Sequence, residues 1–173
     1  MRTHPNIVIT GTPGTGKSTH CTALAKLLPD MEIIAINDFV KEHKLEDGFD
    51  EERQSTMVDE DKLVDLLEPR LKKGGVVIDW HVCDVFPEDV IDLVVVLRTA
   101  TNRLYDRLKK RGYSDKKFED NMDAEIMDVI LQDAKDAYEP EVLIELTSDT
   151  DADVDSNCER IAAWAEQWRK DNA

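Results

Sequence analysis

Residues 6–18 read NIVITGTPGTGKS, and this stretch decides the fold. Its second part, Gly11-Thr-Pro-Gly-Thr-Gly-Lys-Ser18, matches the pattern G-x-x-x-x-G-K-[ST]. The match follows an apolar run, Asn6–Thr10, that predicts a strand, and it opens a segment, Lys17–Leu28, that predicts a helix. A glycine-rich loop in this place lets backbone N–H groups surround phosphate oxygens at the positive end of the helix dipole. The sequence therefore predicts a phosphate-binding P-loop.

The polar residues of this loop each predict a separate contact with a nucleotide. Lys17 is expected to span the β- and γ-phosphates, and the Ser18 hydroxyl is expected to bind Mg²⁺. Thr19 lies one residue further along the start of the helix. The alternative is a glycine-rich turn that merely exposes a lysine, and the flanking strand and helix argue against it.

A carboxylate at the end of a second apolar run fits the same chemistry. The run Gly75-Val-Val-Ile-Asp79 ends in Asp79, and a P-loop needs such an Asp to hold the water shell of Mg²⁺. We therefore predict that Asp79 is the Walker B residue and acts through water. His81 lies two residues further, where open α/β sheets bind ligands. The alternatives are an aspartate that ends a strand and a histidine that only packs.

The rest of the chain alternates β-branched runs with helical spacing, which predicts an α/β fold with a mostly parallel sheet. We expect strands at residues 6–10, 32–36, 76–80, 93–98 and 142–146. We expect helices at residues 17–28, after the capping residues Asn37 and Asp38, from 59 to the glycines at 74–75, at 101–111, at 116–138 and at the C-terminal end.

Three segments need a separate comment. Residues 44–56 have no clean period, and we expect a mobile insertion there. Residues 116–138 are expected to form one long polar helix. The apolar face of the last helix consists of Val154, Cys158, Ile161, Ala165 and Trp168, with Trp164 beside them. We expect both tryptophans to pack on the sheet rather than to bind a ligand.

Composition narrows the possible partners. The chain has 173 residues, 22 Lys and Arg against 38 Asp and Glu, and a net charge of −16. This charge repels a nucleic-acid backbone, so we expect no autonomous DNA binding, whereas a basic protein would be attracted. The apolar runs are far shorter than the roughly 20 residues of a membrane-spanning helix, and Met1–Asn6 offers no secretory signal. We expect a protein that stays inside the cell and does not enter membranes.

The cysteines give no sign of a structural bridge. Cys21, Cys83 and Cys158 are odd in number and far apart, which argues against a disulfide framework and against zinc. We expect three reduced thiols that pack as small apolar groups.

The motifs together resemble one known family. They are Pro5-Asn-Ile7, Gly11-Thr-Pro-Gly14, Asp59-Glu-Asp61, Asp79-x-His81, Asp84-x-Phe-Pro-Glu88, Val96-Leu-Arg98, Leu104-Tyr105, Arg111-Gly-Tyr113 and the Trp164 to Trp168 end. With them the chain resembles the nucleoside monophosphate kinases, and among these the nuclear adenylate-kinase-like ATPases known as adenylate kinase isoenzyme six. The resemblance implies a three-layer P-loop fold with a five-stranded parallel sheet. It also implies one kinase domain over 1–173, with an NMP-binding lobe near 35–58 and a short lid near 110–120.

The same resemblance implies the ATP-binding set. Its members are Gly14, Gly16, Lys17, Ser18, Thr19 and Arg111. Arg107 and Arg111 lie four residues apart and can present two guanidinium groups from one helical face. In the family such a pair packs on adenine and reaches the phosphates, whereas the alternative is two exposed arginines at a helix C-terminus. The catalytic set implied in this way is Lys17, His81, Arg107 and Arg111.

The acceptor side departs from metabolic adenylate kinases. Asp38 and Lys41 are the predicted NMP-binding residues, and Lys41 stands where those enzymes have an arginine. Cys83 occupies the place of a second arginine, and Lys116 with Lys117 are the basic residues of the lid. A lysine offers one point charge where arginine offers a bidentate contact, so AMP should be held less firmly and ATP hydrolysis gains weight. His81 is expected to orient water or the acceptor.

These observations leave three hypotheses about function. The first is transfer of the γ-phosphoryl group of Mg·ATP to AMP, with ATPase activity. The second, implied by the resemblance, is an ATP-driven role in maturation of the small ribosomal subunit and its 18S rRNA, through a basic ribosomal protein of the platform in pre-40S particles. The third is a metabolic adenylate kinase, or a kinase of another small acceptor, without any assembly role. We expect a monomer located in the nucleus and cytoplasm.

Overall fold

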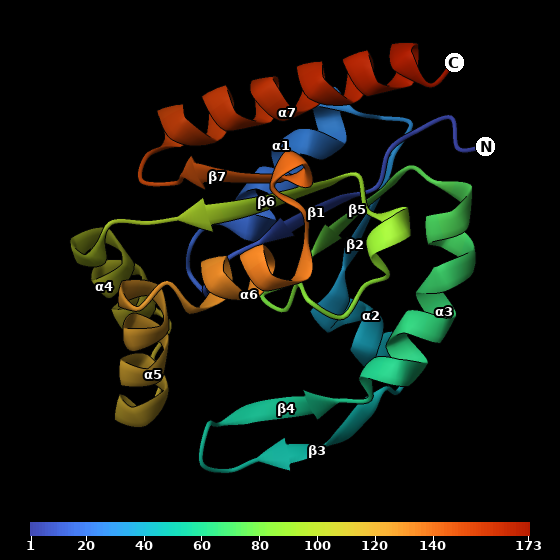
Figure 1. Cartoon of the computed structure of the whole chain (residues 1–173). Helices are drawn as coiled ribbons and strands as arrows, with labels where there is room; N and C mark the ends of the chain where they lie inside the picture. The colour runs from blue at the N-terminus through green and yellow to red at the C-terminus, as the bar shows by residue number, and fades with distance from the viewer.

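A parallel sheet of five strands forms the centre of the computed structural model, which describes residues 1–173 (Figure 1). The order across the sheet is β2-β5-β1-β6-β7. These strands are β1 (Ile7–Thr10), β2 (Glu32–Ala35), β5 (Val76–Asp79), β6 (Leu93–Arg98) and β7 (Leu143–Thr147). Every neighbouring pair is parallel, so all five carboxyl ends lie at one edge. The expected α/β fold with a five-stranded parallel sheet is confirmed.

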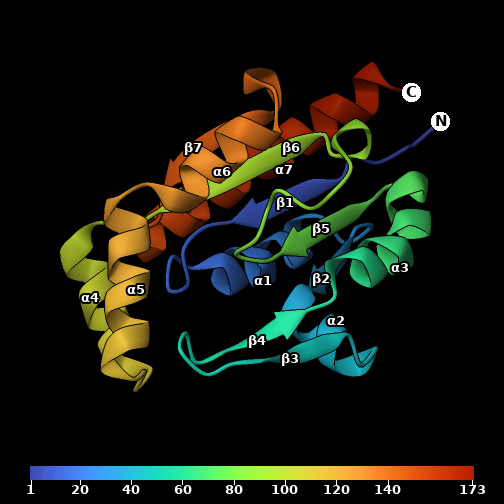
Figure 2. The ribbon, with the colours of Figure 1, turned by 60° about the horizontal axis from the view of Figure 1, so that its bottom comes forward.

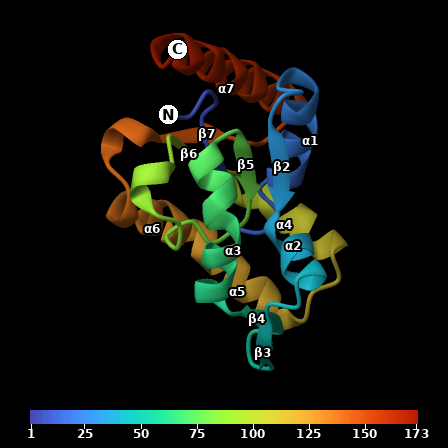
Figure 3. The same cartoon turned by 90° about the vertical axis from the view of Figure 1, so that its right-hand side faces the viewer.

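Helices cover both faces of this sheet and complete three layers (Figure 3). On one face lie α1 (Lys17–Leu27) and α7 (Asp151–Asp171). On the other lie α3 (Glu60–Lys73) and α6 (Val129–Ala137). The connection from β1 through α1 to β2 is therefore a βαβ crossover, as the alternation of patterns in the sequence predicted.

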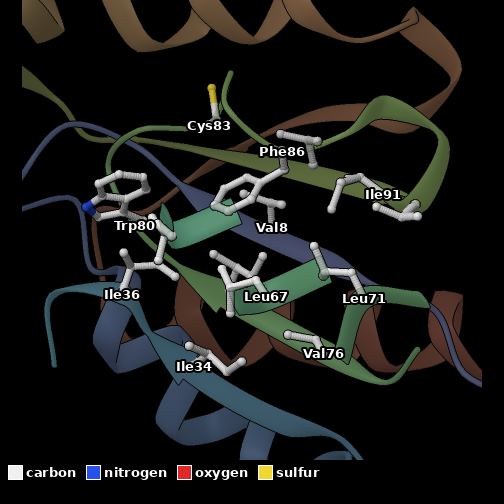
Figure 4. Close-up of a cluster of buried hydrophobic side chains, with 14 of the residues drawn as sticks. Val8, Ile34, Ile36, Leu67, Leu71, Val76, Trp80, Cys83, Phe86 and Ile91 are labelled. Carbon is white, nitrogen blue, oxygen red and sulfur yellow. The ribbon is translucent and has the colours of Figure 1, made fainter. Parts of the chain in front are cut away.

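The strands are buried on both sides, which explains their nearly continuous apolar sequences. In β1, Val8 packs toward α3, whereas Ile7 and Ile9 pack toward α1 and α7. Figure 4 shows the α3 side, where Leu67 and Leu71 meet the sheet. Two apolar clusters, one on each face, thus hold the β1 strand and place the loop that follows it.

The segment 44–56, to which the sequence analysis assigned no element, forms a hairpin. Its strands are β3 (Glu46–Asp50) and β4 (Ser55–Val58), which pair in antiparallel fashion. Phe49 and Met57 are about half exposed, at 54% and 51%. Because the hairpin projects from the body and buries neither face fully, its sequence lacks the apolar alternation of a packed strand.

The expected long helix over 116–138 was wrong, because two helices occupy this region. They are α5 (Asp115–Ile126) and α6, and Asp128 between them adopts a left-handed conformation with φ of 58°. Arg98 at the end of β6 fixes the break, since its guanidinium donates to Asp128 Oδ1 at 2.5 Å and to the Glu125 carbonyl at 3.0 Å. The contact is long-range, so no glycine or proline in the sequence announces the break.

Two smaller expectations also need correction. The helix α2 (Ile36–Glu42) begins directly after β2, so Asp38 lies in its first turn and does not cap it. In α7 Trp164 packs against the core cluster as expected, but Trp168 is only half-buried and lies under the Arg2 guanidinium at 5.6 Å. The core position of Trp168 was therefore wrong, because the end of α7 extends beyond the sheet (Figure 1).

The remaining elements connect these layers. They are α4 (Thr101–Lys110) and two short 3-10 turns, Glu88–Val90 and Pro140–Val142. All three cysteines are free and buried, as expected. None of the helices combines the length and the apolar character that crossing a lipid bilayer would require.

Candidate active site

A cavity of about 1140 Å³ opens at the carboxyl edge of the sheet. Its walls come from the P-loop, from α2, from the β3–β4 hairpin, from the end of β5 and from most of the length of α5. Figure 2 shows the hairpin and α5 on either side of the P-loop end of α1. Segments that are far apart in the sequence therefore enclose the predicted phosphate site.

The P-loop has the backbone that its glycines predict. Gly16 has φ of 95° and directly precedes the first turn of α1. A side chain at this position would be strained and would meet the Ser148 hydroxyl. His20 supports this turn from below, with its Nδ1 at 2.7 Å from the Gly16 carbonyl and its Nε2 at 3.2 Å from the Asn157 amide. His20 of α1 thus connects the P-loop turn to α7.

Lys17 lies folded over the P-loop. Its Nζ donates to the carbonyls of Gly11 at 2.9 Å and Thr12 at 3.2 Å. Burial lowers the pKa of Lys17 to about 8, although the nearby Asp79 carboxylate opposes this shift. When a nucleotide binds, phosphate oxygens can replace these carbonyls as the acceptors of the ammonium.

Ser18 and Asp79 meet as the two motifs predicted. The Ser18 hydroxyl donates to Asp79 Oδ2 at 3.0 Å, and both residues line the cavity with Thr19. Burial raises the pKa of Asp79, and the hydrogen bond from Ser18 opposes that shift. A hydroxyl and a carboxylate are hard oxygen ligands that suit Mg²⁺, which normally takes few protein ligands and completes its shell with water and phosphate. The residues present therefore fit the metal that the sequence predicted.

His81, two residues after Asp79, also lines the cavity. Its half-buried position, together with the charges of Lys17 and Lys117, lowers its pKa to about 4. Trp80 holds the imidazole edge-on, with ring centroids 5.7 Å apart. The ring is consequently neutral at physiological pH and can offer one donor and one acceptor nitrogen.

The arginine pair divides into two different roles. Arg111 is exposed at the cavity wall and donates to the Tyr113 hydroxyl at 2.8 Å. Arg107 points instead at backbone carbonyls, those of Gly14 at 3.2 Å, Ser148 at 3.0 Å and Asp149 at 2.9 Å. The contact of Arg107 with a nucleotide stays a prediction, whereas its contact with the P-loop is present in the structure.

On the acceptor side the structure separates the two predicted residues. Lys41 lines the cavity from α2. Asp38 is exposed on the same helix and is not among the lining residues, although its charge acts on Asp79. Asn37 takes a place in the wall instead. Cys83 is buried below the wall, where its carbonyl accepts a hydrogen bond from the Tyr138 hydroxyl at 2.6 Å.

The hairpin and α5 touch each other across the cavity. Lys117 Nζ donates to the Gln54 carbonyl at 3.2 Å, and Lys116 Nζ lies 3.9 Å from Glu52. The ammonium of Lys117 also lies 4.3 Å from the centre of the Tyr113 ring. These contacts join the two predicted lobes over the P-loop.

Sequence reasoning missed much of the wall, including Asn37, Trp80 and Tyr113. Trp80 is almost fully buried, and its indole N–H has no partner in the protein. Figure 4 shows this nitrogen at the end of the ring that points away from the apolar cluster. The position between Asp79 and His81 was the only signal in the sequence, because a tryptophan in an apolar stretch ordinarily reads as core.

Comparisons with known proteins bear on this site. Residues 7–128 match the family described as AAA domain. The protein named "Adenylate kinase isoenzyme 6 homolog FAP7" from Saccharomyces cerevisiae is 54% identical over 164 residues, which cover 95% of this chain and 83% of that protein. A protein of Schizosaccharomyces pombe named "Adenylate kinase isoenzyme 6 homolog" is 48% identical and covers 97% of this chain and 95% of its own. The chain belongs to the adenylate kinase isoenzyme 6 family.

The resemblance that the motifs indicated is thereby confirmed, and with it a P-loop enzyme of the nucleotide kinase type. Solved structures agree at the level of the fold. A shikimate kinase from Bacteroides thetaiotaomicron superposes with a TM-score of 0.61 at 17% identity, over 94% of this chain and 98% of that one. A gluconokinase from Sinorhizobium meliloti gives a TM-score of 0.53 at 16% identity, with full coverage of both chains. This chain thus shares its fold with these two kinases.

Proposed function

We propose that this protein transfers the γ-phosphoryl group of Mg·ATP to AMP and also hydrolyses ATP. One observation carries the proposal: Lys17, the Ser18–Asp79 pair and the neutral His81 all face a single cavity. The names of its relatives as adenylate kinases support the choice of reaction.

The donor nucleotide would lie along the P-loop. Backbone N–H groups of the turn from Gly14 to Gly16 face the phosphates, and Lys17 moves its ammonium onto them. Arg111, which also lines the cavity, would contact the triphosphate. Ser18 would bind Mg²⁺ directly and Asp79 through water. When bound, the metal neutralises phosphate charge and orients the triphosphate.

The acceptor would lie between α2 and His81. Lys41 is the predicted cation on that wall, and Asn37 adds an amide beside it. The thiol of Cys83 is buried and takes no part in the wall, so this position supplies no cation. Arg53 of the hairpin also lines the cavity. A single ammonium holds a phosphate less firmly than a guanidinium fork, which favours water as a competing acceptor. His81, uncharged, would orient whichever acceptor is present.

The hairpin and α5, which together form the roof of the cavity, decide in this proposal whether the γ-phosphoryl group passes to AMP or to water. The segment 35–58 would act as the NMP-binding lobe and the segment 110–120 as the lid. Their contact through Lys117 and the Gln54 carbonyl limits the entry of water. Arg107 would contribute by holding the Gly14 carbonyl.

We further propose that the ATP cycle serves maturation of the small ribosomal subunit and its 18S rRNA in the nucleus and cytoplasm. The partner would be a basic small-subunit ribosomal protein of the pre-40S platform, bound by a monomer. The net charge of −16 supports a basic partner. The family resemblance of the sequence motifs implies the same assignment.

Product stoichiometry tests the chemical proposal. The purified protein is incubated with Mg·ATP, with or without AMP, and ADP and free phosphate are measured by chromatography. We expect two ADP for each ATP when AMP is present, and a slower release of phosphate without AMP. The Lys17→Met variant should form neither ADP from AMP nor free phosphate. Equal rates for the wild type and this variant would contradict the proposal.

Association with purified basic ribosomal proteins of the small subunit tests the assembly role. We expect one of them to bind and to dissociate or rearrange when Mg·ATP is added. If none binds, the protein is a nucleotide kinase without this role.

A further inference from the structure

A buried carboxylate, Glu125, connects the P-loop to the base of the lid. Its side chain is 4% exposed and accepts three hydrogen bonds. Oε1 accepts from the Thr12 hydroxyl at 3.1 Å and from Arg98 Nε at 3.2 Å. Oε2 accepts from the Thr99 backbone N–H at 2.9 Å. Since every partner is a donor and one is a guanidinium, both oxygens of the buried carboxylate have hydrogen-bond partners.

The contact with Thr12 acts on the P-loop itself. Thr12 is completely buried inside the loop, so its hydroxyl has no water to bond with. Its carbonyl accepts from Lys17 Nζ and from the Thr15 hydroxyl at 2.7 Å. A displacement of Thr12 would therefore move both the resting partner of the catalytic lysine and the turn that receives the phosphates.

A second connection reaches the P-loop from the same node. The Thr99 hydroxyl accepts from Arg107 Nη1 at 3.2 Å, and the same Arg107 nitrogen donates to the Gly14 carbonyl at 3.2 Å. The end of β6 thus contacts the loop at two places, through Glu125 to Thr12 and through Arg107 to Gly14. Glu125 is the member of this network that lies on a lid helix.

The helix α5 extends the connection from the P-loop to the hairpin. Glu125 lies in the last turn of α5, whereas Lys116 and Lys117 lie in the first turn and contact the hairpin. Arg98 grips the same end of the helix through the Glu125 carbonyl and Asp128. One end of α5 is therefore anchored beside the P-loop while the other end closes the cavity.

We propose that Glu125 is a positioning residue that holds the P-loop in its ATP-binding conformation and joins it to the lid helix α5. The inference rests on the proposed function, since it concerns the ATP half of that reaction. Glu125 touches neither substrate and acts through Thr12.

Two single variants and their combination test this role. Glu125→Met removes both acceptor oxygens at a similar side-chain length, whereas a glutamine would keep one oxygen that could still accept from Thr12. Thr12→Val removes the hydroxyl donor while it keeps the shape of the side chain. We expect each variant to raise KM for ATP roughly 10- to 100-fold, with KM for AMP unchanged. The KM for ATP of the double variant should be no higher than that of the more strongly impaired single variant, because Glu125 acts on the ATP site through Thr12. Thr12→Ser, which keeps the hydroxyl, should restore the ATP affinity.

The chain offers a matched control in Glu145. This carboxylate also contacts Arg98, at 3.4 Å, but it is half exposed and does not reach the P-loop. Glu145→Gln should leave KM for ATP unchanged. If Glu125→Met does not fold, Thr12→Val and Thr12→Ser still decide the question.

The result that overturns the inference is a loss of thermal stability without any change in ATP affinity. The affinity is measured by calorimetry with a non-hydrolysable ATP analogue and Mg²⁺. A wild-type protein that binds no analogue would contradict the proposed function. Equal binding by the wild type and Thr12→Val would contradict only the role of Glu125.

Discussion

At the scale of single residues, burial sets the charge of the groups that meet the nucleotide. Lys17 and His81 both lie against the same carboxyl edge, and burial lowers the pKa of each. The lysine keeps its charge at neutral pH, because its pKa is still about 8, whereas the histidine, at about 4, does not. Burial thus leaves Lys17 as a cation and His81 as a neutral ring at neutral pH.

The lysine value predicts a pH dependence. kcat/KM reports ionisations of the free enzyme, and ATP requires the charged form of Lys17. We expect kcat/KM for ATP to fall as the pH rises through about 8, where the free Lys17 loses its proton. In Lys17→Arg the falling limb should move to higher pH, because a guanidinium stays protonated. A wild-type profile that is flat up to pH ~10 would contradict the prediction.

His81 predicts an effect on stability in acid. Its pKa is about 4 in the folded protein, below the ordinary value of 6.5, so the unfolded chain binds more protons between these values. Stability should therefore fall as the pH decreases from about 6.5 to 4. His81→Gln removes this contribution, so urea unfolding of the variant should depend less on pH in that window. A dependence identical to that of the wild type would contradict the assignment.

Asn6 predicts a large loss of stability outside the site. Its buried amide donates to the carbonyls of Leu71 at 2.7 Å and Val90 at 2.8 Å, and its oxygen accepts from the Val76 N–H at 3.1 Å. We expect Asn6→Ala to lower the free energy of unfolding by about 2–4 kcal/mol, because buried backbone groups lose their partners. Urea denaturation measures the change.

Asn172→Ala is the control for Asn6. This exposed amide makes a single bond, to the Trp168 carbonyl at 2.8 Å. Its removal should change the free energy of unfolding by at most about 0.5 kcal/mol. Comparable losses in the two variants would mean that Asn6 does not join α3, β5 and the 88–90 turn to the sheet.

At the scale of elements, the active site depends on a hairpin and a helix that meet only over the cavity. The β3–β4 hairpin belongs to the first half of the chain and α5 to the second. Their junction consists of a few polar contacts between exposed or half-exposed side chains. Such contacts are individually weak, so the roof can open for substrates without unfolding of the core.

A charge reversal at this junction should change the products. Lys116→Glu places a second carboxylate near Glu52, which lies 3.9 Å from the present ammonium. We expect the lobes to separate and the share of ATP that yields free phosphate to rise several-fold in the presence of AMP. Lys110→Glu, at the exposed end of α4 and outside the cavity, is the control and should leave the product ratio unchanged. The same ratio in all three proteins would show that this contact does not exclude water.

At the scale of the whole molecule, charge determines which partners can approach. A net charge of −16 on 173 residues produces a field that attracts basic surfaces and is screened by salt. We expect the Kd for a basic ribosomal protein to rise at least about 10-fold when the salt concentration increases from roughly 0.05 to 0.5 M. Titration at several salt concentrations measures this slope. A Kd that does not depend on salt would mean that apolar contacts, and not charge, dominate the association.

The sequence by itself determined the parts of this protein that depend on neighbouring residues. The glycines, lysine and serine of the P-loop act within one turn, so their spacing alone predicted the phosphate site. The strands of the sheet could also be predicted from the sequence, because strands buried on both faces are apolar throughout. Asp79 followed from the same argument, since it ends such a strand, and the structure places it 3.0 Å from Ser18.

Features that depend on contacts between distant segments became visible only in the folded chain. The spacing of Arg107 and Arg111 suggested a common direction, but the 148–149 loop and Gly14 supply the carbonyls that turn Arg107 away from the cavity. The break after α5 requires Arg98, which comes from another strand. The hairpin has no packed face, so no period marked it. Glu125 looks like any polar helix residue until folding places Thr12, Arg98 and Thr99 around it, because the burial of a charge is a property of the assembled fold.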